Sequence, residues 1–499
     1  MQQYCFKQDY PLSTTVLKSD YWIGIDIGTT NTKAVAFDDT GKVQAQHSLS
    51  YEMQHPEPDF SEQHPDDIWH AVTGSLQSLA EKLPEATFRS ISFSAAMHSI
   101  MAVDEQGNPI SNLIIWADNR AKAESEKLLK SPTGKKIYKA CGTPLHPMAP
   151  ICKLMWLRKH QPELVARAYK FVGIKEYIWF KLTGEWVIDY SLASATGMFD
   201  LRALTWNQVA LSTAKIKAEK LSKPVSPYHT FSWKANIILK QEICQLVIGA
   251  SDGCLANLGT GAVIKGRLAV TIGTSGAVRI SSKRPILDEK MRTFCYLLDE
   301  ETYIIGGGTN SGGVVFQWLC EQFFPDQNEA QLSELAASVP AGSNGLICLP
   351  YLLGERAPLW NANAKGCFFG ITLRHTAKDF SRAVLESICM HMYSVVKILE
   401  EREDIFEIYA SGGFAKSPFW VQLLADICGK PVRLPETVEA GAWGAALMAL
   451  KAEGIIQDHG EKMKGLAIKQ SFTPCSEKHQ FYEKLYEKFT KLYKLTKNM

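Results

Sequence analysis

The same short pattern occurs twice in this chain, once near the start and once just past the middle. Residues 25–30 read Ile-Asp-Ile-Gly-Thr-Thr, and residues 270–275 read Val-Thr-Ile-Gly-Thr-Ser. In both places an apolar run leads into a Gly-Thr turn, and a second run rich in β-branched and small residues follows. The repeat predicts two α/β lobes of like architecture, each opening with a β-hairpin whose tip points at a common cleft.

Hydrophobic periodicity predicts how the rest of the chain is organised. Strands are expected at residues 21–27, 32–37, from 43, 89–93, 114–116, 246–248, 267–272, 277–280 and 406–410. Helices are expected at residues 66–83, 152–158, 379–400, 418–428 and 440–453. We assign the first lobe to residues 21–259 and the second to residues 260–499. Residues 1–20 form a polar tail without the apolar segment of a signal peptide.

The last 25 residues have the pattern of a basic amphipathic helix. Phe481, Leu485, Phe489 and Leu492 recur at helical spacing with lysines between them. Such a stripe commonly docks on its own domain, and that is the interpretation we favour. A membrane-surface helix or a calmodulin target is the alternative.

Composition excludes several classes of protein. The 499 residues carry 54 Lys and Arg against 52 Asp and Glu, a net charge of +2, without the basic excess of a nucleic-acid binder. No apolar run approaches the about 18 residues that a membrane helix needs. The 12 cysteines include no Cys-x-x-Cys pair. We expect a cytoplasmic protein with reduced thiols that binds neither nucleic acid nor membrane. A homodimer is one of the oligomeric states that the sequence leaves open.

Three turns containing glycine follow apolar strands, at residues 26–31, 273–276 and 411–413. Backbone N–H groups of such turns approach an anion closely, and Thr or Ser hydroxyls add donors. The chain has no Gly-x-x-x-x-Gly-Lys-Ser/Thr motif, which excludes a P-loop enzyme. No Gly-x-Gly-x-x-Gly opens a βαβ unit, which disfavours a dinucleotide fold. Three separate turns suit a nucleotide held between lobes.

Two aspartates stand where apolar strands run into turns. Asp26 needs a partner for its charge, either Mg²⁺ with its bound waters or the backbone amides of the turn. Asp252 lies among small residues in Gly-Ala-Ser-Asp-Gly, so a ligand can reach its carboxylate. In phosphoryl transfer such an aspartate can accept the proton of the attacking hydroxyl. An ordinary Ser-Asp-Gly turn is the alternative.

Taken in order, these motifs resemble the FGGY family of carbohydrate kinases from about residue 21 to 495. The resemblance is carried by residues 26–33, 62–65, 97–98, 116–120, 249–253, 272–276 and 411–417. It implies two actin-like, ribonuclease-H-like α/β lobes with an active-site cleft between them. The first lobe would bind the sugar, ATP and Mg²⁺ would bind mainly to the second, and the lobes would close around both.

The resemblance also implies residue roles. Asp252 matches the catalytic base, and Asp26 matches the carboxylate near Mg²⁺. The implied nucleotide positions are Gly28, Thr29, Thr30, Asn31, Lys33, Gly273, Thr274, Gly313, Gln317, Gly413 and Ser417. The implied sugar contacts are Met97, His98 and Met148. Phe414 stands where many relatives carry Gly or Ala, which we expect to reshape the adenine pocket.

The substrate is expected to be a sugar acid. Residues 96–99, 141–150, 189–197 and 354–358 are similar to the members that phosphorylate gluconate on its C6 hydroxyl. A polyhydroxy acid needs hydrogen-bond donors and a fixed positive charge. First-lobe candidates for these groups are His98, Asn119, Arg120, His146, Lys153 and Lys175, of which we leave out Lys175. Xylulokinase-like members share part of these segments, so a kinase for a ketopentose or another polyol is the alternative. A further alternative is an actin-like ATPase that is not a kinase, and residues 97–98 and 251–252 disfavour it.

Overall fold

The computed structural model describes residues 19–436 and 439–497. Nearly all of the polar tail expected at residues 1–20 lies outside the described residues. Its last residue, Asp20, already begins the first strand of the first sheet.

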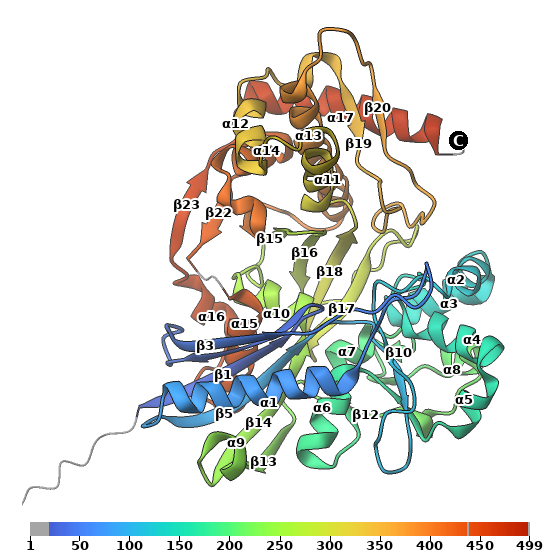
Figure 1. The fold of residues 1–499 in the computed structure, drawn as a ribbon, viewed down its shortest axis with the longest axis vertical. Helices are drawn as coiled ribbons and strands as arrows, with labels where there is room; N and C mark the ends of the chain where they lie inside the picture. The colour runs from blue at the N-terminus through green and yellow to red at the C-terminus, as the bar shows by residue number, and fades with distance from the viewer. Residues whose placement is uncertain (1–18, 437–438, 498–499) are drawn as a thin grey trace, which may run out of the picture.

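The described residues form two large mixed sheets, one in each lobe, as Figure 1 shows. The first is six-stranded, with the order β13-β14-β5-β1-β2-β3. Its strands are β1 (Asp20–Ile27), β2 (Asn31–Phe37), β3 (Val43–Ser50), β5 (Thr87–Ala95), β13 (Thr230–Lys234) and β14 (Ile243–Ser251). The second is seven-stranded, with the order β17-β18-β16-β15-β21-β22-β23. Its strands are β15 (Arg267–Ile272), β16 (Gly276–Ser282), β17 (Phe294–Asp299), β18 (Thr302–Thr309), β21 (Glu407–Ser411), β22 (Val432–Pro435) and β23 (Ile468–Phe472).

The two sheets share one topology around the repeated motif. In the first, β1 pairs antiparallel with β2 and parallel with β5. In the second, β15 pairs antiparallel with β16 and parallel with β21. A further parallel strand follows in each sheet, β14 beside β5 and β22 beside β21. The expected pair of like lobes, each opening with a hairpin, is confirmed.

Helices cover the sheets, and the strands between them are buried on both faces, which suits their Val- and Ile-rich sequences. The helices of the first half are α1 (Pro65–Lys82), α2 (Lys122–Leu129), α3 (Pro132–Cys141), α4 (Pro150–His160), α5 (Pro162–Arg167), α6 (Ile174–Thr183), α7 (Tyr190–Ser194), α8 (Gln208–Ala214), α9 (Asn236–Leu239) and α10 (Asp252–Gly259). Those of the second half are α11 (Gly313–Phe323), α12 (Glu329–Ala337), α13 (Ala377–Glu400), α14 (Pro418–Cys428), α15 (Ala440–Ala452), α16 (His459–Lys464) and α17 (Ser476–Thr496).

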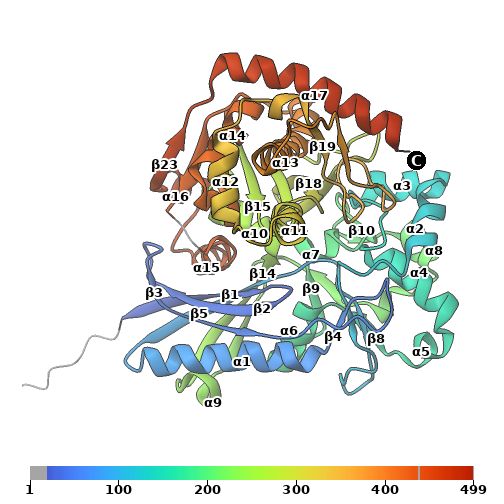
Figure 2. The ribbon, with the colours of Figure 1, turned by 45° about the horizontal axis from the view of Figure 1, so that its top comes forward.

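Short two-stranded sheets complete the lobes. They pair β4 (Glu62–Gln63) with β7 (Leu113–Ile114), β6 (Met101–Val103) with β8 (Lys170–Val172), β9 (Val187–Asp189) with β12 (Lys223–Val225), β10 (Phe199–Asp200) with β11 (Thr205–Trp206), and β19 (Ile347–Leu349) with β20 (Cys367–Phe369). Figure 2 shows helices α2, α3, α4, α5 and α8 gathered to one side of the first sheet.

Helices α10 and α15 lie between the two large sheets (Figure 1). Glycines make their packing close. A Cβ on Gly259 of α10 would lie 2.0 Å from the carbonyl oxygen of Ala440, and one on Gly444 of α15 would lie 2.1 Å from that of Leu255. Helix α15 also packs on β1, so this part of the second half is joined to the sheet of the first.

The C-terminal helix α17 packs its apolar stripe on its own lobe, as favoured from the sequence. Leu485, Phe489 and Leu492 are buried as expected. Phe481 is not, because 43% of it is exposed, and Tyr482 is buried in its place. The buried face of α17 is therefore shifted by one residue at the N-terminal end of the helix. Within the described residues, no helix combines the length and apolarity needed to cross a membrane.

Candidate active site between the lobes

A cavity of about 250 Å³ is lined by residues of both halves of the chain. The first half contributes Thr29, Met97, His98, Trp116, Met148 and Asp252. Ser275, Arg279, Tyr296 and Arg356 are among the contributions of the second half. The tips of both repeated hairpins thus reach one cavity, because Thr29 belongs to the first turn and Ser275 to the second.

Asp252 is the first residue of α10, directly after the buried strand β14. Its Oδ1 accepts a 2.7 Å hydrogen bond from the N–H of Gly253. Burial raises the pKa of Asp252 to about 6, and the charge of Asp26 adds to this while that of Arg279 opposes it. The neighbouring Ser251 completes a Gly-x-Ser-x-Gly sequence, but it is buried and bonded to Ser191, so it does not line the cavity.

Asp26 is the second-to-last residue of the first strand, and its carboxylate lies against the first turn of α15. A Cβ on Gly441 would lie 2.5 Å from Asp26 Oδ2, while Oδ1 accepts a 2.6 Å hydrogen bond from the hydroxyl of Ser94. Burial raises the pKa of Asp26, with Glu439 adding to the rise and Lys33 opposing it. The described residues contain no cluster of three His, Cys, Asp or Glu side chains able to hold a metal ion.

Mg²⁺ can be held without such a cluster, since it commonly uses one or two carboxylates and the substrate's phosphates. The donor set around Asp26 is compatible with that mode, because the side chain is only half-buried and its hydrogen bond from Ser94 uses Oδ1 and leaves Oδ2 as a possible ligand. The chemistry of these oxygens therefore fits the ion.

The first glycine turn connects β1 to β2. The N–H of Gly28 closes the turn on the carbonyl of Asn31 at 3.0 Å. Thr29 Oγ1 accepts a 2.8 Å hydrogen bond from the indole of Trp116, so its own proton is left to donate. Thr30 is exposed at the tip. Lys33 Nζ contacts both carboxylate oxygens of Glu439 at 2.9 Å, so its charge is balanced by the residue before α15.

The second and third turns lie beside each other at the ends of the parallel strands β15 and β21. Thr271 and Ser411 share a 3.1 Å hydrogen bond between their hydroxyls. Helix α11 begins on the second turn, because Gly313 N–H donates to the carbonyl of Gly273 at 2.7 Å. Thr274 lines an adjoining cavity of about 370 Å³. Gly413 is exposed, with open space where a Cβ would lie.

The other two nucleotide positions lie on the helices that follow these turns. Gln317 is exposed on α11 and donates to Glu321 at 2.8 Å. Ser417 caps α14 by accepting a hydrogen bond from the N–H of Trp420 at 3.3 Å. Phe414 is buried edge-on against Trp420 at 5.8 Å between ring centroids, so its ring packs inward rather than into open space.

Three sugar-contact candidates line the cavity beside Asp252: Met97, His98 and Met148. His98 has a positive φ of 69°, a conformation uncommon for a non-glycine residue and concentrated at functional sites. Its Nδ1 donates to the carbonyl of Ala195 at 2.8 Å. Burial, with the charges of Lys153 and Arg356, lowers the pKa of His98 to about 3. The imidazole is therefore neutral at pH 7, and its Nε2 is an acceptor that lies 3.5 Å from the hydroxyl of Tyr296, another residue of the cavity lining.

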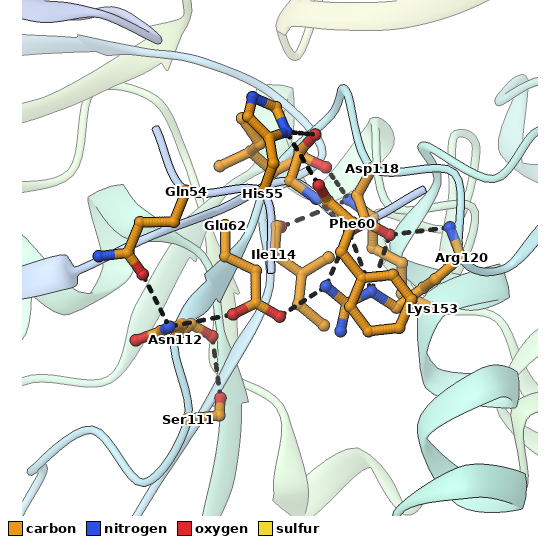
Figure 3. Close-up of polar contacts among 12 residues, drawn as sticks. Gln54, His55, Phe60, Glu62, Ser111, Asn112, Ile114, Asp118, Arg120 and Lys153 are labelled. Atoms are coloured by element: carbon orange, nitrogen blue, oxygen red, sulfur yellow. Dashed lines mark hydrogen bonds and ion pairs between the residues drawn. The ribbon is translucent and has the colours of Figure 1, made fainter. Parts of the chain in front are cut away.

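The structure does not bring Arg120 and Lys153 into this cavity. Figure 3 shows both tied to protein groups. The guanidinium of Arg120 pairs with Asp118 at 2.8 Å and with Glu62 at 2.5 Å, and it stacks 3.7 Å over the ring of Phe60. These contacts orient the segment that carries Trp116. Because the guanidinium is already paired with two carboxylates of the protein, it is not available to bind the carboxylate of a substrate.

Lys153 is fully buried in α4. Its ammonium donates to the carbonyls of His98 at 2.7 Å and Ile115 at 2.7 Å, and more weakly to that of Ile114 at 3.4 Å. It therefore holds the backbone of a cavity residue without reaching the cavity. Asn119 faces the adjoining 370 Å³ cavity together with Thr274.

The cationic groups of the central cavity are Arg279 and Arg356, which the sequence reasoning missed because it searched the first lobe. Arg279 lies on β16, and Arg356 lies in the connection between β19 and β20. Arg356 Nε donates to Asn310 at 2.8 Å and Nη2 to the carbonyl of Thr309 at 2.8 Å. The signal for Arg279 was present in the sequence, as an arginine in an otherwise apolar strand after the second Gly-Thr turn.

Two like sheets meeting over a cavity with a buried aspartate define the actin-like, ribonuclease-H-like class of two-lobed α/β enzymes. Models of the N-terminal and C-terminal domains of the FGGY family of carbohydrate kinases match residues 21–259 and 268–453. This chain belongs to the FGGY family of carbohydrate kinases, and it is an enzyme of that type.

Individual relatives span almost the whole chain. A gluconokinase from Bacillus subtilis (strain 168) is 40% identical over 496 residues, covering 96% of this chain and 97% of that protein. Solved structures titled as a gluconate kinase and as a ligand-bound xylulose kinase, both from Lactobacillus acidophilus, each align with a TM-score of 0.92. Each of the two is 36% identical, and the alignment covers 95% of this chain and 98% of the other.

Proposed function

We propose that this carbohydrate kinase transfers the γ-phosphoryl group of ATP to the C6 hydroxyl of D-gluconate, giving 6-phospho-D-gluconate and ADP. The observation that carries the proposal is the 40% identity to a gluconokinase over nearly the full length of both chains. The cavity supports it, because it combines one carboxylate suited to be a base with two guanidinium groups suited to an acid substrate.

Asp252 is the residue that acts on the hydroxyl. With a pKa of about 6, it is ionised at neutral pH, yet it is a stronger base than an exposed aspartate. It orients the C6 hydroxyl and accepts its proton as the oxygen attacks the γ-phosphorus in line. General-base assistance of this type contributes about 10²–10⁴ in rate.

The sugar chain lies along Met97, His98 and Met148. Because His98 is neutral, it does not bind the carboxylate. Its Nε2, which the Tyr296 hydroxyl contacts only at 3.5 Å, accepts a hydrogen bond from a substrate hydroxyl. Thr29 keeps a free hydroxyl proton, since Trp116 already donates to its oxygen. Such a set of donors and acceptors matches a chain of hydroxyl groups.

The nucleotide lies along the glycine turns of the two hairpins and the start of α11. Gly273 and Gly413 leave open space where a Cβ would lie, so phosphate oxygens can approach the backbone of these turns without a side chain intervening. Asp26 would hold Mg²⁺, which when bound offsets the negative charge of the phosphates. Closure of the lobes excludes water that would otherwise hydrolyse ATP. On this proposal residues 21–259 supply the base, most sugar contacts and the first phosphate turn, and residues 260–499 supply the other contacts to the nucleotide.

A coupled assay of ADP release tests the proposal with gluconate, xylulose, ribulose and glycerol as acceptors. Gluconate is expected to give the highest kcat/KM, and ATP turnover is expected to depend on an acceptor. Preference for xylulose or ribulose would favour the ketopentose kinase, and turnover without any polyol would favour a non-kinase ATPase.

We propose that the enzyme works in the cytoplasm, where ATP is available. Eleven cysteines of the described residues are free, and most are buried, which supports a reducing compartment. Its partners on this proposal are small molecules. The homodimer stays a prediction, which sedimentation equilibrium would check.

A further inference from the structure

Arg279 is a half-buried cation whose Nε atom is buried and left without a hydrogen bond by the protein. It lies on β16 opposite Gly306 of β18, and it lines the central cavity. Among the described residues, its Nε has no hydrogen-bond partner. Such a group is costly to bury unless a ligand satisfies it. Arg356, which lines the same cavity, is by contrast held in place by Asn310 and Thr309.

The charges that line this cavity do not balance. Asp252 is the acidic residue of the lining, against the two guanidinium groups of Arg279 and Arg356. Burial lowers the pKa of Arg356, and the nearby charge of Arg279 adds to this, while the carboxylates of Glu355 and Asp252 oppose it. The arrangement has room for an additional anion between or beside the guanidinium groups, and such an anion would relieve their repulsion.

Other cations of the first lobe are committed elsewhere. Lys175 pairs with Asp189 at 2.8 Å, and Arg120 pairs with Asp118 and Glu62. Burial also lowers the pKa of His146 to about 3, so it carries no charge at pH 7. An anionic end of the substrate therefore finds its counter-charge on the second-lobe side of the cavity.

Two anions could meet Arg279: the carboxylate of the acceptor or the γ-phosphate of the donor. The position along β16 favours the carboxylate. Arg279 is three residues beyond Gly276, the end of the second turn, which at ~3.4 Å per residue places its Cα about 10 Å from the tip. Its side chain shares the cavity with Met97 and His98 and with Ser275 and Gly276 at the end of the turn, while Thr274 at the tip lines the adjoining cavity.

We propose that Arg279 binds the carboxylate of the sugar acid, with Arg356 supporting it, and so sets the preference for an acid over a neutral polyol. The inference rests on the proposed function. A guanidinium suits this task because it donates two parallel hydrogen bonds to a carboxylate. On this inference, a change of Arg279 on β16 would let the same fold accept neutral sugars in place of acids.

The test compares D-gluconate with D-gluconamide, which has the same carbon chain without the charge. Kinetics and calorimetric binding of both compounds would be measured for wild type, Arg279→Met and Arg279→Lys. Arg284→Met is the matched control, because that side chain lies just after β16 and is 75% exposed. Melting temperatures would show that each variant is folded.

For Arg279→Met we expect kcat/KM and binding affinity for gluconate to fall about 10- to 100-fold. We expect gluconamide binding and the KM for ATP to change less than threefold, and Arg279→Lys to recover part of the gluconate affinity. Equal losses for both compounds, or a raised KM for ATP, would overturn the inference by placing Arg279 on the phosphoryl group. The proposed function fails separately, if wild type neither binds nor phosphorylates gluconate.

Discussion

Gly24 of β1 lies directly against the backbone of Ala442 in α15, although the two are more than four hundred residues apart. A Cβ at position 24 would lie 1.9 Å from the carbonyl oxygen of Ala442. A helix from the second half of the chain therefore packs on the first sheet, on the strand that carries Asp26. Through this contact, the strand that carries the Asp26 carboxylate is joined to α15, a helix from the second half of the chain.

Gly24→Ala is expected to destabilise the protein by about 2–4 kcal/mol, because the backbone of α15 must move away from the added methyl group. Chemical denaturation measures the free energy of unfolding. Gly465→Ala is the matched control, since its φ is −87° and nothing lies within 4 Å of its Cβ position. An equal effect of the two substitutions would contradict the close packing of β1 on α15.

The pH dependence of kcat/KM should report the ionisation of Asp252. Burial raises its pKa to about 6, and only the ionised carboxylate accepts a proton. Activity should therefore fall as pH drops through about 6, reaching roughly one tenth near pH 5. In Arg279→Met the same decline should begin at a higher pH, because the guanidinium opposes the rise in the pKa of Asp252. A profile unchanged down to pH 4.5 would exclude Asp252 as the titrating base.

Lys153→Met should leave the buried carbonyls of His98, Ile114 and Ile115 without their shared donor. We expect a loss of about 2–4 kcal/mol in stability and a raised KM for gluconate, because His98 would lose the contact that holds its strained backbone. The KM for ATP should change little. The control is Lys159→Met on the same helix, where 66% of the side chain is exposed. If Lys159→Met raised the KM for gluconate as much as Lys153→Met does, Lys153 would be acting only through the general stability of the protein.

The sequence predicted the two lobes well because the repeated hairpin is a local signal. Apolar strands around Gly28 and Gly273 carry their own turn chemistry, and the long helix expected at residues 379–400 is observed as Ala377–Glu400. Local patterns did not reveal which lobe α15 packs on, since that depends on glycines such as Gly24 meeting a helix far along the chain.

The hydrogen-bond and ion-pair partners of side chains could not be predicted from the sequence either. Asp252 and the Met97–His98 pair stand next to strand ends, so their places follow from topology. Arg120 looked available, but Asp118 two residues earlier and the distant Glu62 both bind it. Nothing local distinguishes a cation that has such partners from one that lacks them. Arg279 was missed for another reason, because the search for cations was confined to the first lobe.

The direct test of the account is the activity of Asp252→Asn, with ADP release measured on gluconate alongside binding of both substrates. Because the ionised carboxylate is buried at a cost, the variant should be about 1–3 kcal/mol more stable at pH 7 than wild type. It should bind gluconate and ATP while kcat falls at least 10²-fold, and the exposed Asp39→Asn control should keep full activity. A folded Asp252→Asn enzyme with kcat within tenfold of wild type would contradict the central claim.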